Sequence, residues 1–139
     1  MAIDTHIKFD GIVGEATHVD HKGEIDVLSW SWGVSNVSQI SGTGLGKGKA
    51  NPGDLVFHHS YDKASPLLAR RCVDGTHFKE VTLTARKSGE GQKDFLKVTM
   101  KSVCITSVQP AGGGGGDITE SVSMSYESID FSYKPQDEK

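Results

Sequence analysis

Alternation of apolar and polar side chains runs through most of this chain and constrains its fold more than any other feature. On a β-strand, such alternation places one set of side chains on each face. The alternating segments are residues 7–9, 28–34, 55–57, 81–85, 96–105 and 122–133. The chain is therefore predicted to be mainly β, with strands that bury one face and expose the other.

The last two alternating segments each change phase partway along. In the first, the apolar positions are even-numbered up to Met100 and odd-numbered from Val103; in the second, they are even-numbered up to Tyr126 and odd-numbered from Ile129. A slip of one residue is what a β-bulge or a sharp bend produces, and such bends let one strand pass from one sheet to another. We therefore expect a closed or nearly closed β-barrel of two packed antiparallel sheets.

The segment at residues 28–32 carries two tryptophans that alternate with serines. Leu28, Trp30 and Trp32 share one face and are assigned to the core. Ser29 and Ser31 share the opposite face, which carries small hydroxyl side chains.

A single short α-helix is expected after residue 64. Ser65 is expected to cap its first amides, and Pro66 suits the first helical position because its missing N–H is not needed there. Gly75 suits a left-handed residue that ends the helix. The apolar stripe is assigned to Leu68 and Cys72, widened by Leu67, Ala69 and Val73. So short a helix must lie on the barrel or plug one end of it.

Residues 36–54 are rich in glycine and form an unusually long connection, which is typical of a functional loop. Their glycines match neither the GxxxxGK[ST] nor the GxGxxG pattern, so a nucleotide site is not predicted. A mobile hairpin tip is the plain alternative for this loop. The second glycine run, residues 112–116, precedes a strand pattern and is interpreted as a turn.

Length and charge set further bounds. The 139 residues predict one domain, 1–139, and a formal net charge of −3 gives no basic field that would attract nucleic acid. The first thirty residues contain no apolar run, so neither a signal peptide nor a membrane span is expected. Cys72 and Cys104 are interpreted as buried free thiols.

Candidate catalytic and metal-binding residues are sparse. His58 and His59 are adjacent on a strand, so their side chains point to opposite faces and cannot share a metal ion. His18, Asp20 and His21 are interpreted as a solvated turn, with a weak surface metal site as the alternative. No GxSxG motif presents a nucleophilic serine. We expect no enzyme activity, no metal and no cofactor.

Several segments together resemble one known family. They are FDGIVGEA (residues 9–16), EIDVLSWSWG (24–33), DKASPLL (62–68), GTHFKEVTLTARKSG (75–89), FLKVTM (95–100) and TESVSMSYESIDFSY (119–133). In this order and spacing they resemble the haemolysin-coregulated protein (Hcp) family, the tube subunits of bacterial type VI secretion systems. The resemblance implies a homohexameric ring that stacks into a hollow tube inside a contractile sheath, beneath a tip spike. It also implies release from the cytoplasm without a signal peptide, and small effectors carried in the lumen.

On that picture, surfaces of the subunit are assigned to contacts. Ser29 and Ser31 are expected to face the lumen and its cargo, since small hydroxyl side chains suit a wet channel. The ring-stacking loop is assigned to Gly42, Gly44, Leu45, Gly46, Lys47, Gly48 and Lys49. The acidic surface that meets its lysines is assigned to Glu15, Asp20 and Glu24.

A second class of function is kept open. A monomeric or dimeric β-barrel would bind a small ligand, with the long loop as a lid over the barrel mouth. The mass of the particle in solution distinguishes this module from a ring.

Overall fold

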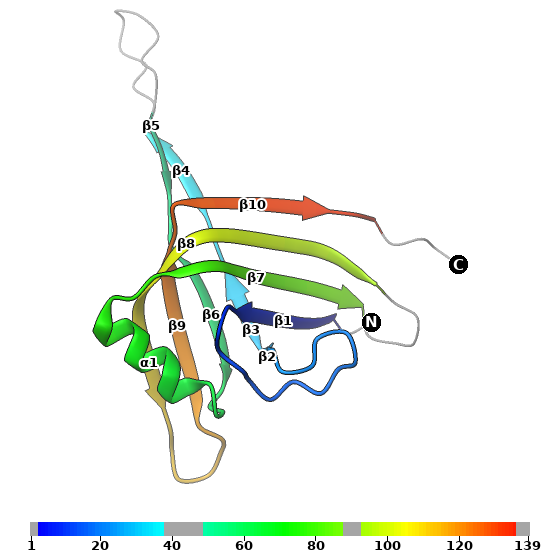
Figure 1. The fold of residues 1–139 in the computed structure, drawn as a ribbon, viewed down its shortest axis with the longest axis vertical. Coiled ribbons are helices and arrows are strands. Elements are labelled where there is room, and N and C mark those ends of the chain that lie inside the picture. The colour runs from blue at the N-terminus through cyan, green and yellow to red at the C-terminus, as the bar shows by residue number, and fades with distance from the viewer. Residues whose placement is uncertain (1–2, 38–48, 88–92, 136–139) are drawn as a thin grey trace, which may run out of the picture.

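The computed structural model describes residues 3–37, 49–87 and 93–135. It contains ten strands and one helix in these residues (Figure 1). In chain order they are β1 (Ile3–Phe9), β2 (Ile25–Val27), β3 (Ser29–Ser31), β4 (Val34–Val37), β5 (Lys49–Pro52), β6 (Leu55–Ser60), α1 (Ser65–Asp74), β7 (Phe78–Lys87), β8 (Asp94–Ala111), β9 (Thr119–Ser125) and β10 (Ser128–Tyr133). All strand pairs are antiparallel.

The long strand β8 belongs to two sheets. Its first half lies between β7 and β10 in sheet A, which continues through β1 to β2. Its second half pairs with β9 in sheet B, which continues through β6 to β3. At the bend between Met100 and Val103, Ser102 has a positive φ of 53°, and the register with β9 shifts between Ile105 and Ser107. The expected change of sheet at this phase slip is confirmed.

The second expected bend is a break between two strands. β9 pairs with the second half of β8 and β10 with the first half, with Tyr126 and Glu127 between them. The chain therefore leaves sheet B and enters sheet A at the position where its apolar phase changes.

Sheets A and B are also joined through β2 and β3. β2 pairs with β1 and β3 with β6, and Leu28 alone separates them. The backbone N–H of Leu28 donates a hydrogen bond to the carbonyl of His58 at 2.7 Å. The sheet is thus not closed by a continuous hydrogen-bond ladder. Its two end strands, β2 and β3, follow each other directly in the chain, which brings the ends of the sheet together into a barrel-like fold.

The assignment of Leu28 to the core is wrong. Its side chain is 62% exposed, because the inward positions change from odd to even between β2 and β3. Ile25 faces inward on β2, whereas Trp30 faces inward on β3. Trp30 and Trp32 are half-buried and pack against the core. This is a third phase slip of the kind recognised in the last two strands.

Aromatic and aliphatic side chains from both sheets fill the barrel interior. Phe9 lies 5.0 Å from Phe78 and 5.9 Å from Phe57 between ring centroids, and all three are buried. Helix α1 packs against β8 beside this core (Figure 1). The two cysteines are free, as expected, but both are half-buried.

The helix differs from expectation at its start and on its apolar face. Ala64, not Ser65, is the N-cap residue, and no side chain caps the helix. Ser65 is buried and its hydroxyl accepts a hydrogen bond from the backbone N–H of Asp62. Leu68 is buried, but Leu67 and Val73 are exposed, so the buried stripe is narrow. Gly75 ends the helix with φ of 70°, as expected.

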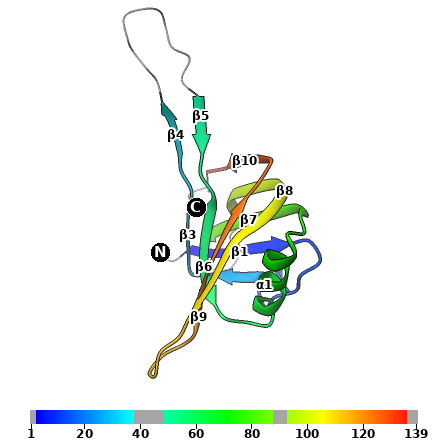
Figure 2. The ribbon, with the colours of Figure 1, turned by 90° about the vertical axis from the view of Figure 1, so that its left-hand side faces the viewer.

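Strands β4 and β5 form a separate two-stranded hairpin. Val34 pairs with Pro52 at its base and Val37 with Lys49 at the far end of the described part. Both views show this hairpin projecting away from the barrel (Figures 1 and 2). The described ends of the connection expected at residues 36–54 are therefore the two arms of a β-ribbon.

Candidate functional site

The outer face of sheet B carries the predicted lumen residues. Ser29 lies opposite His58 on β6, and His58 lies opposite Ser121 on β9. Ser121 in turn pairs with Gln109 on β8. Because these positions alternate with buried core positions, all four side chains point away from the barrel interior.

A second row runs across the same strands. Ser31 lies opposite Val56, which pairs with Ser123, which pairs with Ser107. Across the two rows, five of the eight side chains are serine and none is Lys, Arg, Asp or Glu. Ser29 Oγ lies 3.3 Å from His58 Nδ1, so neighbouring side chains of this surface contact one another. We call these eight residues the serine face.

The base of the hairpin is held to the barrel by a short chain of hydrogen bonds. The indole N–H of Trp32 donates to the Tyr126 hydroxyl at 2.6 Å, and that hydroxyl donates to the carbonyl of Gly53 at 2.7 Å. Gly53 also donates its backbone N–H to the carbonyl of Gly33 at 2.9 Å. The Trp32 ring lies against Phe131 of β10, with centroids 4.8 Å apart. The link between β9 and β10 thus fixes where the hairpin leaves the barrel.

Most of the predicted stacking loop lies outside the described residues. This applies to Gly42, Gly44, Leu45, Gly46, Lys47 and Gly48. Lys49 is the first residue of β5. The assignment of these residues to ring stacking stays a prediction.

The predicted acidic surface lies in one segment, residues 10–24, which connects β1 to β2. Glu15 accepts a hydrogen bond from the backbone N–H of Lys63 at 2.8 Å, next to the start of α1. Asp20 accepts one from the guanidinium of Arg86 at 3.1 Å. This hydrogen bond, followed by the positive charge of Arg86, lowers the pKa of Asp20. Arg86 itself is buried.

Glu24, the third acidic residue, binds His21. The imidazole of His21 is buried between two carboxylates, with Nδ1 at 3.1 Å from Glu24 and Nε2 at 3.0 Å from Asp94. Burial alone would lower the pKa of His21, but the hydrogen bonds and charges of Asp94 and Glu24 together outweigh it and raise that pKa. The interpretation of His18, Asp20 and His21 as a solvated turn is therefore wrong for His21, which is buried, whereas Asp20 is exposed and His18 is half-buried.

Comparison with known proteins places these features in a family. The family model described as type VI secretion system effector, Hcp, matches residues 6–133. Protein hcp1 of Pseudomonas aeruginosa is 41% identical over 139 residues, which cover 98% of this chain and 86% of that protein. The chain belongs to the Hcp family.

Solved structures of Hcp relatives agree with this assignment. A structure of a type six secretion system protein matches with a TM-score of 0.92 at 32% identity, covering 99% of this chain and 87% of that one. Hcp1 from Salmonella typhimurium matches with a TM-score of 0.80 at 32% identity, covering 99% and 92%. This Hcp chain is thus a component of type VI secretion, and its barrel-like fold is that of its relatives.

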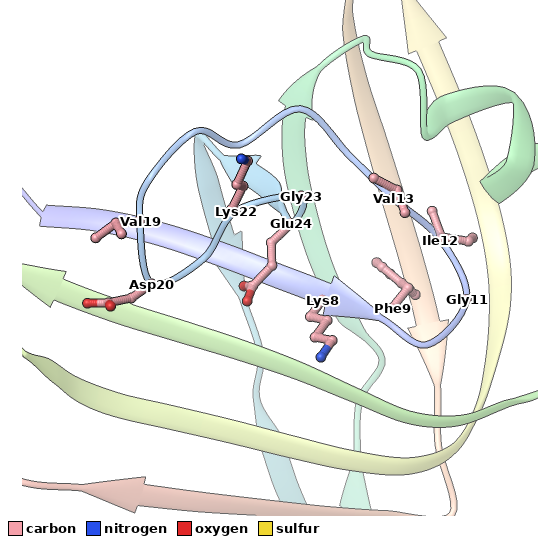
Figure 3. Close-up of a pocket in the computed structure, with 10 residues that line it drawn as sticks. All are labelled: Lys8, Phe9, Gly11, Ile12, Val13, Val19, Asp20, Lys22, Gly23 and Glu24. Carbon is pink, nitrogen blue, oxygen red and sulfur yellow. The ribbon is translucent and has the colours of Figure 1, made fainter.

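A surface hollow of this Hcp chain lies outside the barrel. Figure 3 shows it between residues 10–24 and the end of β1, with a volume of about 530 Å³. Its lining mixes apolar side chains, such as Val13 and Val19, with charged ones, such as Lys8 and Glu24. The described arms of the loop predicted as a lid, β4 and β5, point away from the barrel.

In the described part of the chain, no group of three or more His, Cys, Asp or Glu side chains is placed to hold a metal ion. In the same residues, no helix is long and apolar enough to cross a membrane. His58 is exposed and His59 is buried, so the two point to opposite faces as expected.

Proposed function

We propose that this chain forms a homohexameric ring whose bore is lined by the serine face, and that the rings stack into the inner tube of a type VI secretion system. The tube would lie inside the contractile sheath and beneath the tip spike, and small effectors would travel in its lumen. The subunit would leave the cytoplasm with the tube, through the secretion machine. Membership of the Hcp family supports this proposal.

The serine face is the observation that carries the assignment of the bore. It spans all four strands of sheet B, whereas the sequence indicated only Ser29 and Ser31. Side chains of this size keep a channel wide, and an uncharged wall does not select cargo by the sign of its charge. A ring also needs two different contact patches on each subunit, because a two-fold contact would end at a dimer.

The hairpin is the candidate for contact between rings. It extends beyond the barrel, where it can reach a neighbouring subunit (Figure 2). Its lysines would meet Glu15, Asp20 and Glu24, which the segment at residues 10–24 holds in place through hydrogen bonds. A small-ligand module is the runner-up, with no cofactor or nucleic acid in either case.

The bore assignment is tested with Ser31→Glu. At 14.9 kDa per chain, a hexamer has a mass of about 90 kDa, which light scattering distinguishes from a monomer or dimer. We expect Ser31→Glu to form rings of this mass, visible by negative-stain microscopy, and to lose at least tenfold in cargo binding. The reason is that six carboxylates would enter one bore.

The matched control is Ser132→Glu, an exposed serine on β10 of sheet A. It should form rings and bind cargo as the wild type does. Equal cargo binding by both variants would contradict the bore assignment. A wild-type particle of 15 to 30 kDa under all conditions would instead favour the small-ligand module.

A further inference from the structure

Three histidine rings hold residues 10–24 against sheet A. His6 lies on β1, and His18 and His21 lie in the segment itself. The rings of His6 and His21 stack with centroids 4.7 Å apart and an interplanar angle of 13°. His18 lies 5.7 Å from each of them. The segment therefore docks on sheet A through titratable groups.

Other contacts of the segment with the sheet are ionic, beside the apolar packing of Ile12 in the core. Asp20 binds Arg86 of β7, and His21 binds Asp94 of β8 at 3.0 Å. Arg86 also lies 3.9 Å from Asp94. Because these ionic groups lie close together, a change in the charge of one member alters the balance among them.

His6 is the member whose protonation the structure disfavours. Its side chain is 5% exposed, and its Nε2 lies 3.2 Å from Asp26 Oδ1 on β2. Its Nδ1 is buried and has no hydrogen-bond partner among the described residues. The hydroxyl of Thr84, the cross-strand partner of His6 on β7, is likewise buried without a partner. A second proton on His6 would thus create a buried N–H without an acceptor.

The proton would also meet a like charge across the stack. His21 lies between Glu24 and Asp94, which favour its imidazolium form. The charged and titratable groups around the two rings, taken from every element, are Lys8 (β1), Asp26 (β2), Arg86 (β7), Asp94 and Lys97 (β8), and His18, Asp20 and Glu24 (residues 10–24). Asp26 is 68% exposed and so compensates poorly for a second imidazolium.

We propose that residues 10–24 form an acid-released latch, docked on sheet A while His6 is neutral and released when His6 is protonated. This inference concerns the single subunit and goes beyond the proposed function in the tube. It holds or fails whether or not rings stack.

The sign of the pH effect follows from two opposite shifts. Burial, and then the charge of His21, lower the pKa of His6 below its ordinary value of 6.5. Below pH 6.5 the released state therefore binds more protons, and docking weakens as the pH falls through the lowered pKa. The raised pKa of His21 has the opposite effect on docking. The stabilisation that charged His21 gives to docking is complete below pH 6.5 and is lost only as the pH rises through the raised pKa. On the acid side of 6.5, His6 sets the response.

Hydrogen exchange measured by mass spectrometry tests the latch on the full chain. Five amides report on it, because those of Gly14, Ala16, His21, Gly23 and Glu24 donate to carbonyls within the segment. Exchange is compared at pH 7.0, 6.0 and 5.0 after correction for the intrinsic exchange rate at each pH. We expect protection of residues 10–24 to fall by up to about tenfold per pH unit, while β7 keeps its protection. Unchanged protection of the segment, or an equal loss in β7, would overturn the proposal.

Two variants of His6 assign the response to this residue. His6→Phe keeps an aromatic ring in the stack but cannot be protonated, so its protection should not change with pH. His6→Gln keeps an N–H donor. If His6→Phe does not fold, the same hydrogen-exchange measurement on His6→Gln tests the latch instead. His77→Phe, an exposed histidine just before β7, is the matched control and should keep the wild-type response. An acid response in the His6 variants as large as in the wild type would refute the latch.

Discussion

At the scale of single residues, a buried polar pair stands out in the core of sheet B. His59 and Glu120 are cross-strand partners with side chains 0% and 1% exposed, and His59 Nε2 lies 2.7 Å from Glu120 Oε1. His59 Nδ1 has no further partner in the described residues. The hydrogen bond to Glu120 therefore carries the whole compensation for burying this imidazole.

Removing one partner of this pair should be costly. We predict that Glu120→Ala lowers the free energy of unfolding by about 3 kcal/mol, because it leaves a buried imidazole without a partner as well as a cavity. Urea denaturation at a fixed protein concentration measures the change. Glu127→Ala, an exposed glutamate between β9 and β10, is the control and should change it by less than about 0.5 kcal/mol. A loss below about 1 kcal/mol for Glu120→Ala would show that the pair is not stabilising.

The sequence predicted whether a side chain is buried or exposed only where alternation within one strand decides it. The outward direction of Ser29 and Ser31 follows from alternation within β3. The exposure of Leu28 does not, because it depends on the break between β2 and β3. The burial of His6, His21 and Arg86 comes from residues 10–24 folding over sheet A, and no local pattern indicates that cover.

At the scale of elements, the hairpin depends on the contact at its base. The described arms, β4 and β5, pair with each other and not with the barrel sheets. Tyr126 joins the base to the barrel by accepting from Trp32 and donating to Gly53. The direction of the hairpin is therefore set by a side chain on the link between β9 and β10.

We predict that Tyr126→Phe loosens the hairpin while the barrel stays folded. The substitution keeps the ring but leaves the indole N–H of Trp32 and the carbonyl of Gly53 without this partner, at a cost of about 1 to 2 kcal/mol. Hydrogen exchange of β4 and β5 should rise about tenfold, and negative-stain images should show shorter stacks of rings. Tyr133→Phe, at the exposed end of β10, is the control and should leave both unchanged. Unaltered exchange in the hairpin of the Tyr126 variant would contradict this role.

Elements were predictable where a phase change marks a bend. The passage of β8 between sheets, and the bend between β9 and β10, follow from the numbering of apolar residues, whereas their pairing with the two halves of β8 is seen only in the structure. The same signal between Ile25 and Trp30 marks the change from β2 to β3. The hairpin arms were not predicted, because Val34–Val37 and Lys49–Pro52 pair on a ribbon outside the core and carry no alternation that burial would impose.

At the scale of the whole molecule, the two sheets divide the surface by chemistry. Sheet B presents the uncharged serine face, whereas the outer face of sheet A carries charged side chains such as Lys8, Glu80, Lys97 and Lys101. Residues 10–24 add their acids above sheet A. In the ring proposed above, this division would separate a bore lined by the serine face from charged surfaces available to other partners.

The charged contacts between rings should then be the part of the assembly that salt weakens. Exposed ion pairs are screened over about 10 Å at 0.1 M salt and about 3 Å at 1 M. We predict that stacks shorten between 0.1 M and 1 M salt while rings of about 90 kDa persist, measured by sedimentation and negative-stain microscopy.

Lys47→Gln combined with Lys49→Gln should form short stacks at low salt and respond little to added salt. Replacing Lys93, an exposed lysine just before β8, with Gln should leave the wild-type salt response intact. Removal of the two lysines and screening of their charge by 1 M salt should both shorten the stacks. Stacks that remain long in both experiments would place the contact between rings elsewhere than the hairpin.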